Sequence, residues 1–97
     1  MKIYISGKIT GLEYQEADKL FNEAKLKLQE KGCEVINPLH IPTGVENPEW
    51  DDYMVSDIRE LFKCDGIYML KNWKTSRGAR IEHYIAKEIG LIIAYEY

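Results

Sequence analysis

Two carboxylic acids occupy positions where the helical pattern of the sequence places apolar side chains. Glu82 and Asp57 each share a helical face with hydrophobic residues, at spacings of three, four or seven positions. The face around Glu82 carries Ile85, Ala86 and Ile89, and the face around Asp57 carries Trp50, Tyr53, Leu61 and Cys64. An unpaired carboxylate on a buried face carries a large desolvation cost. We therefore expect both faces to open onto a cavity.

The surroundings of the two acids predict different protonation states. Glu82 lies near the start of its predicted helix, where the helix dipole favours the ionised form. Asp57 lies among aromatic and aliphatic neighbours, which favour the protonated form. Two carboxyl groups in different environments are what glycosidic-bond chemistry uses, one as nucleophile and one to assist the leaving group. Alternatively, each acid is a structural group paired with a tyrosine hydroxyl or with Arg59, Arg77 or Arg80.

Four cations lie within ten residues of each other, just before and at the start of the predicted helix that carries Glu82. They are Lys71, Lys74, Arg77 and Arg80, and they lie beside Ser76 and Gly78. Free backbone amides, the helix dipole and nearby cations together form an anion site, and phosphate is a common ligand of such sites. The alternative is a solvated loop with ordinary surface cations.

The segment Ser6-Gly7-Lys8 predicts a glycine turn at the end of a strand, which lets a ligand approach the backbone. It is not a phosphate loop, because the required earlier glycine is replaced by Lys2. Aromatic side chains could stack on a base or belong to the core, and these are Tyr4, Tyr14 and Trp73. No metal-ligand spacing surrounds His40, Cys33 or Cys64, so we predict no metal site. Glycosidic-bond chemistry with two carboxyl groups requires no organic cofactor, so we also expect none.

The elements that position these residues alternate between strand and helix. Strands are predicted at residues 3–5, 33–37, 66–70 and 91–95, and helices at 13–31, 49–63 and 77–88. A proline-containing loop covers residues 38–48. Alternation of this kind predicts a three-layer, Rossmann- or flavodoxin-like α/β fold with a four-stranded parallel sheet in the order 2-1-3-4. Ligands bind such sheets at the carboxyl ends of the strands, here beside residues 6–8, 71–76 and the start of the last helix.

Composition limits the function classes. The 97 residues form one predicted domain, 1–97, and the net charge of −3 disfavours binding to long nucleic acid. No apolar run is long enough to span a membrane and no signal segment is visible, so we expect a cytoplasmic protein. A chain of this length buries a modest share of its surface, which favours a homo-oligomer.

The chain resembles the nucleoside 2-deoxyribosyltransferase-like family, including its 2′-deoxynucleoside 5′-phosphate N-hydrolases and a branch of short, often phage-borne domains. The resemblance spans nearly the whole chain. It rests on residues 3–7 with Ile9 and Gly11, on Ser56-Asp57-Ile58, on Cys64-Asp65-Gly66, and on residues 76–82, Ser-Arg-Gly-Ala-Arg-Ile-Glu. The most specific element is the spacing from Ser76 through Gly78 to Glu82.

The resemblance implies cleavage or transfer at the N-glycosidic bond of a (deoxy)nucleoside or its 5′-monophosphate. It implies that Glu82 is the nucleophile, that Asp57 lies in the active site, and that Ser76 and Gly78 lie at the 5′-phosphate. The full set of expected substrate-binding residues is Tyr4, Ser6, Gly7, Lys8, Asn72, Trp73, Ser76 and Gly78. The segment Lys71 to Thr75 lacks the family's acidic stretch, and Thr10 lies near a family arginine. The alternative is therefore a non-catalytic module that binds a nucleotide in the same cleft.

Overall fold

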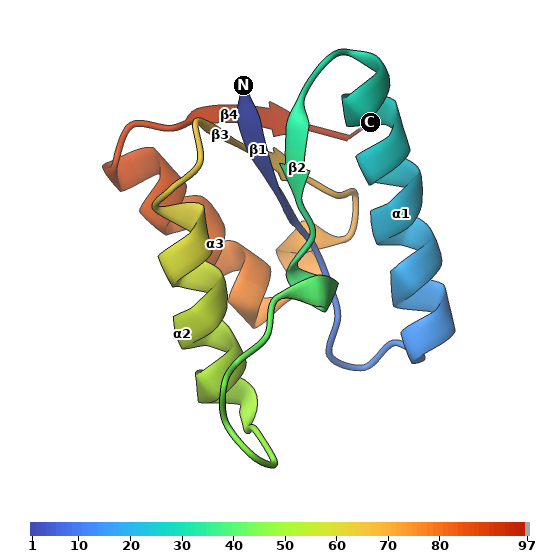
Figure 1. The fold of residues 1–97 in the computed structure, drawn as a ribbon, viewed down its shortest axis with the longest axis vertical. Helices are drawn as coiled ribbons and strands as arrows, with labels where there is room; N and C mark the ends of the chain where they lie inside the picture. The colour runs from blue at the N-terminus through green and yellow to red at the C-terminus, as the bar shows by residue number, and fades with distance from the viewer. Residues whose placement is uncertain (97) are drawn as a thin grey trace.

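The computed structural model describes residues 1–96 and contains one parallel sheet in the strand order β2-β1-β3-β4 (Figure 1). The strands are β1 (Lys2–Ser6), β2 (Glu34–Ile36), β3 (Gly66–Met69) and β4 (Ile92–Tyr95). Every pair of neighbouring strands is parallel. The predicted α/β class and the predicted order 2-1-3-4 are confirmed.

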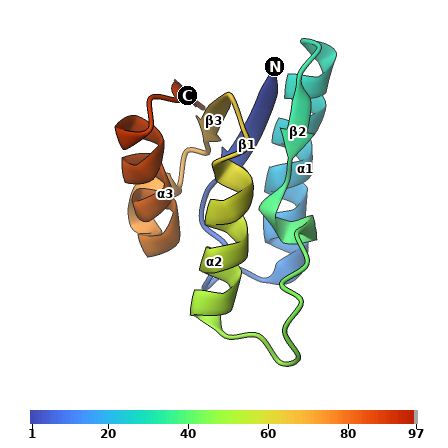
Figure 2. The same ribbon diagram turned by 60° about the vertical axis from the view of Figure 1, so that its left-hand side comes forward.

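Three helices complete the layers. They are α1 (Tyr14–Glu30), α2 (Trp50–Leu61) and α3 (Arg77–Glu88). Figure 2 shows α1 on one side of the sheet and α2 and α3 on the other. Short 3-10 turns, Pro38–His40 and Trp73–Thr75, lie in the predicted loop 38–48 and in the segment 71–76 that follows β3. No helix in residues 1–96 has the length and apolar character needed to cross a membrane.

The central strand β1 is buried on both faces, as expected for a parallel strand covered by helices. Ile3 and Ile5 belong to the apolar cluster packed against α1. Tyr4 belongs to the cluster on the α3 side, and Ser6 has the same parity along the strand. The alternation of side chains in β1 therefore sends the two hydroxyl groups of Tyr4 and Ser6 toward the helix that carries Glu82.

Local capping sets where α2 and α3 begin. At α2, the side chains of Glu49 and Asp52 form a reciprocal capping box with each other's backbone N–H groups. At α3, the Ser76 hydroxyl accepts a hydrogen bond from the Ala79 N–H. The helices begin and end within two residues of the predicted bounds. Both helix starts lie at the same end of the molecule as the carboxyl ends of β1 and β3 (Figure 1).

Candidate active site

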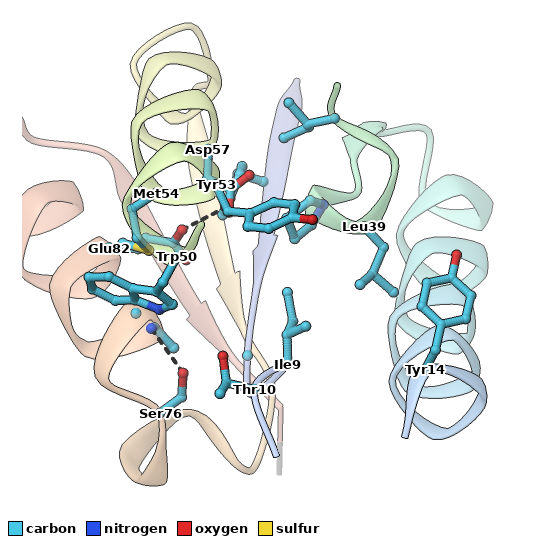
Figure 3. A pocket seen from close by; sticks show the side chains of 16 residues that line it. Ile9, Thr10, Tyr14, Leu39, Trp50, Tyr53, Met54, Asp57, Ser76 and Glu82 are labelled. Carbon is cyan, nitrogen blue, oxygen red and sulfur yellow. Dashed lines mark hydrogen bonds between the residues drawn. The ribbon is translucent and has the colours of Figure 1, made fainter. Parts of the chain in front are cut away.

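A cavity of about 380 Å³ lies at the carboxyl end of β1, between the start of α2 and the start of α3 (Figure 3). Both predicted catalytic acids, Asp57 and Glu82, line it. The other residues that line the cavity are Tyr4, Gly7, Ile9, Thr10, Tyr14, Pro38, Leu39, Ile41, Trp50, Tyr53, Met54, Ser76, Gly78 and Ala79. The structure thus brings together acids from two helices that are separated along the chain by β3.

Two hydroxyl groups of β1 hold the carboxyl group of Glu82. The Tyr4 hydroxyl donates to Oε2 at 2.8 Å and the Ser6 hydroxyl donates to Oε1 at 2.7 Å. Only 5% of Glu82 is exposed. Hydrogen bonds to both oxygens leave the carboxyl group little freedom to rotate, because each bond fixes one end. This arrangement presents a positioned carboxylate on the cavity wall.

Burial raises the pKa of Glu82 to about 7, and the hydrogen bonds from Ser6 and Tyr4 act in the opposite direction. The predicted preference of Glu82 for the ionised form rested on the helix dipole. Burial outweighs that preference, since the group is enclosed on the wall of a largely apolar cavity. The Ser6 and Tyr4 hydroxyl groups offset part of the desolvation of Glu82, because they stabilise its negative charge directly.

Asp57 is 8% exposed and has a pKa raised to about 8. Burial is the main cause, and the negative charge of Glu82 raises the pKa further, while the Tyr4 hydroxyl lowers it. Within residues 1–96, neither Asp57 nor Glu82 forms a salt bridge with lysine or arginine. The alternative in which each acid is neutralised by an arginine is therefore wrong for the described chain. The alternative in which the acid pairs with a tyrosine hydroxyl holds for Glu82, because the Tyr4 hydroxyl donates a hydrogen bond to it.

The predicted substrate-binding residues divide into two groups. Tyr4, Gly7, Ser76 and Gly78 line the cavity, and Ser6 lies behind it, fully buried and bonded to Glu82. Lys8, Asn72 and Trp73 are not among the lining residues.

Those three residues have contacts elsewhere. The Lys8 N–H donates to the Asn72 Oδ1 at 2.9 Å, which ties the loop after β1 to the loop after β3. The Trp73 ring stacks on His83 with a centroid separation of 4.3 Å. His83 follows Glu82 in α3 and is partly exposed, whereas Glu82 is buried on the cavity wall.

Several apolar residues of the cavity wall were not predicted from the sequence. Met54 lies three residues before Asp57 in α2, and Trp50 and Tyr53 were predicted to share the Asp57 face. The helical spacing alone was thus a usable signal for these side chains. Leu39 and Ile41 come from a segment without regular periodicity, so no pattern in the sequence marked them. Ile9 belonged to the residues that carry the family resemblance, but no helical or strand pattern placed it at the cavity.

A metal site is not evident in the described part of the chain. No group of three or more His, Cys, Asp or Glu side chains within residues 1–96 could hold a metal ion. The chemistry available at the cavity is that of two carboxyl groups, the Tyr4 hydroxyl and an aromatic wall.

The comparisons with known proteins agree with the fold. A solved 2-deoxyribosyltransferase from the psychrotolerant bacterium Bacillus psychrosaccharolyticus has a TM-score of 0.75 and 16% sequence identity to this chain. The match covers 98% of this chain and 71% of that one, which confirms the resemblance at the level of the fold. No curated protein matches the sequence significantly. Residues 1–95 match the family described as "Domain of unknown function (DUF4406)", and the chain belongs to that family.

Proposed function

We propose that this protein cleaves or transfers the N-glycosidic bond of a (deoxy)nucleoside or its 5′-monophosphate, with Glu82 as the nucleophile. The observation that carries the proposal is that Asp57 and Glu82 line one cavity, each more than nine-tenths buried. Buried acids with raised pKa values in a cleft are typical of functional sites. The likeness in fold to a 2-deoxyribosyltransferase is consistent with this chemistry.

The presence of two acids on one cavity wall supports a two-step reaction. An oxygen of Glu82 forms a bond to C1′ of the sugar while the bond from C1′ to the base nitrogen breaks. Asp57 delivers its proton to the departing base. Water or a second base then attacks C1′, the bond to Glu82 breaks, and the proton of the attacking group returns to Asp57. Atoms and charges balance over the two steps, and neither step needs a cofactor.

The proton states suit these roles. A pKa of about 7 leaves Glu82 substantially ionised near neutral pH, and a pKa of about 8 leaves Asp57 largely protonated there. Because the two groups interact, the pair titrates in two coupled steps. The form with one proton, carried mainly by Asp57, is the active one, and we expect its population to be greatest between pH 7 and 8.

The side chains that line the cavity suit an amphipathic ligand with a flat ring. Hydroxyl and carboxyl groups come from Tyr4, Asp57 and Glu82, and they can face a sugar. The aromatic and aliphatic side chains of the wall can cover the faces of a base, and they include Tyr14, Leu39, Trp50 and Tyr53. A volume of about 380 Å³ falls within the usual range for small-molecule sites.

Base release is the direct test. The protein is incubated with purine and pyrimidine nucleosides, deoxynucleosides and their 5′-monophosphates, and free base is measured by chromatography. We expect release from at least one of them, and a loss of roughly 10³-fold or more in Glu82→Gln and Glu82→Ala. Glu88→Gln, an exposed acid at the end of the same helix, is the matched control. No release from any compound would overturn the proposal.

A non-catalytic nucleotide-binding module is the second candidate, favoured by the segment after β3. That segment carries no acid between Lys71 and Thr75, and Trp73 within it stacks on His83. Calorimetry separates the two candidates. Tight nucleotide binding without base release, unchanged by Glu82→Gln, supports the module, whereas turnover that depends on Glu82 excludes it.

A further inference from the structure

We propose that Asn72 is a positioning residue, whose side-chain oxygen fixes the backbone segment 7–10 as one wall of the cavity. This role rests on the proposed function, because it concerns a residue that shapes the substrate site without lining it. The Lys8 N–H donates to the Asn72 Oδ1 at 2.9 Å, although the two residues are 64 positions apart. Asn72 is not a lining residue, whereas three residues of the segment line the cavity, namely Gly7, Ile9 and Thr10. Asn72 therefore acts on the cavity through the backbone of Lys8.

The Asn72 side chain replaces a backbone carbonyl at the point where two parallel strands end. The Leu70 N–H donates to the Ser6 carbonyl at 2.8 Å, which continues the ladder between β1 and β3. In a regular parallel ladder the next bond would run from the Lys8 N–H to the Leu70 carbonyl. That carbonyl instead accepts from the Trp73 N–H at 3.0 Å, because the chain enters the 3-10 turn after β3. The Asn72 Oδ1 thus supplies the acceptor that the turn has removed.

Segment 7–10 has few other means of holding its position. It lies outside the helices and strands, and within residues 1–96 the Lys8 N–H is its one backbone group that bonds to a different part of the chain. Close packing fixes the first residue of the segment, because a Cβ at Gly7 would lie 2.7 Å from the Leu70 side chain. Beyond Gly7, the bond to Asn72 is what ties the segment to the end of β3.

Asn72 is itself held by the turn that follows it. Its backbone carbonyl accepts from the Thr75 N–H at 3.2 Å and from the Thr75 hydroxyl at 2.9 Å. The turn leads directly to Ser76, which caps α3 and lines the cavity. Asn72 therefore connects two walls of the cavity, the segment 7–10 and the start of α3.

Loss of the Asn72 oxygen should displace the segment and weaken substrate binding. The half-buried Lys8 N–H would lose its acceptor, and the segment 7–10 would have to move for that group to reach water. A displacement of about 1 Å at a substrate-positioning group can cost about 10²-fold in rate. The pKa values of Asp57 and Glu82 should not follow this movement, because both acids belong to helices and neither contacts the segment through a hydrogen bond.

Kinetics with a substrate that releases its base test this role. Asn72→Leu and Asn72→Ala remove the acceptor and should raise KM about 10- to 100-fold, with a smaller fall in kcat and an unchanged acidic limb of the pH–rate profile. Asn72→Asp keeps an acceptor oxygen and should stay within about threefold of wild type. Asn22→Leu, at an exposed position of α1, is the control and should match wild type. Equal losses in Asn72→Leu and Asn72→Asp, or no loss in Asn72→Leu, would overturn the role of Asn72.

Hydrogen exchange measured by nuclear magnetic resonance keeps this role separate from the proposed function. The Lys8 N–H should exchange at least about 10-fold faster in Asn72→Leu and Asn72→Ala than in wild type and Asn72→Asp. The Leu70 N–H, which bonds within the ladder, should stay protected in all of them and shows that the fold is intact. This pattern supports the positioning of segment 7–10 even if no base is ever released. Base release that depends on Glu82, with unchanged KM in Asn72→Leu, supports the enzyme and rejects the role of Asn72.

Discussion

The Ser6 hydroxyl donates a 2.7 Å hydrogen bond to Oε1 of Glu82, across 76 positions of sequence. Both side chains are buried, with Ser6 at 0% and Glu82 at 5% exposure. The bond links the end of the central strand to α3, restricts the orientation of the carboxyl group and lowers its pKa against the effect of burial. The pH dependence of the proposed reaction should therefore depend on a residue that does not line the cavity.

Ser6→Ala should move the acidic limb of the pH–rate profile to higher pH. The bond from Ser6 lowers the pKa of Glu82, so its removal raises that pKa and the nucleophile ionises later. The profile of kcat/KM between pH 5 and 9 measures the shift. Ser56→Ala, a hydroxyl on α2 that does not line the cavity, is the control and should keep the wild-type profile. An unchanged acidic limb in Ser6→Ala would show that Ser6 does not tune Glu82.

Asp57→Asn should slow the reaction most for bases that leave poorly. An amide cannot deliver a proton to the departing base, and the loss of a general acid typically costs about 10²- to 10⁴-fold in rate. Substrates whose base leaves readily without protonation should lose less. The measurement is kcat across a series of bases with different leaving abilities. A uniform loss across the series would assign Asp57 to sugar orientation alone.

The free energy of unfolding should fall as the pH rises from about 4 to about 8. The pKa values of Asp57 and Glu82 are raised in the folded protein to about 8 and about 7, from 3.8 and 4.5. Between these values the folded state binds more protons than the unfolded state, so stability decreases with increasing pH. Each extra proton contributes a slope of about 1.4 kcal/mol per pH unit.

Urea unfolding at a series of pH values measures this slope. Asp57→Asn should flatten it, because one of the two shifted groups is gone. Asp51→Asn, an exposed acid in the first turn of the same helix, should leave the slope unchanged. A wild-type slope of zero across this range would contradict the burial of the two acids.

Gly7→Ala should destabilise the protein. An added Cβ would lie 2.7 Å from Cδ1 and 2.9 Å from Cβ of Leu70, which is 2% exposed and follows β3. The Leu70 Cβ is fixed by the backbone, so the strand ends must separate, at a cost of about 1–3 kcal/mol. Gly78→Ala meets the flexible Met54 side chain first, at 3.1 Å, and should cost less. Chemical unfolding of both variants checks the order.

The sequence was sufficient to predict the sheet order and the opening of the Asp57 and Glu82 faces onto a cavity. Regular alternation of strands and helices leaves few topologies, and Asp57 and Glu82 break apolar helical faces. The two hydroxyl groups that donate to Glu82 were not predicted as its hydrogen-bond partners. Tyr4 and Ser6 are two residues apart in β1 and therefore lie on the same face of the strand. Combined with the parallel topology, that spacing could have placed both hydroxyl groups opposite α3.

The loops could not be predicted in the same way. Trp73 was expected at the substrate, and the structure places its ring against His83. Nothing periodic fixes a side chain in a 3-10 turn, so its direction depends on tertiary contacts that the sequence does not display. The contact between Arg77 and Trp50 is of the same kind, since it joins the starts of α2 and α3.

The stereochemistry of methanolysis tests the central claim most directly. Substrate is turned over in the presence of methanol, and nuclear magnetic resonance determines the configuration at C1′ of the methyl glycoside. Attack by Glu82 followed by attack by methanol inverts C1′ twice, so we predict retention, giving the β-methyl glycoside from a β-nucleoside. An α-methyl glycoside would show a single displacement and would contradict Glu82 as the nucleophile.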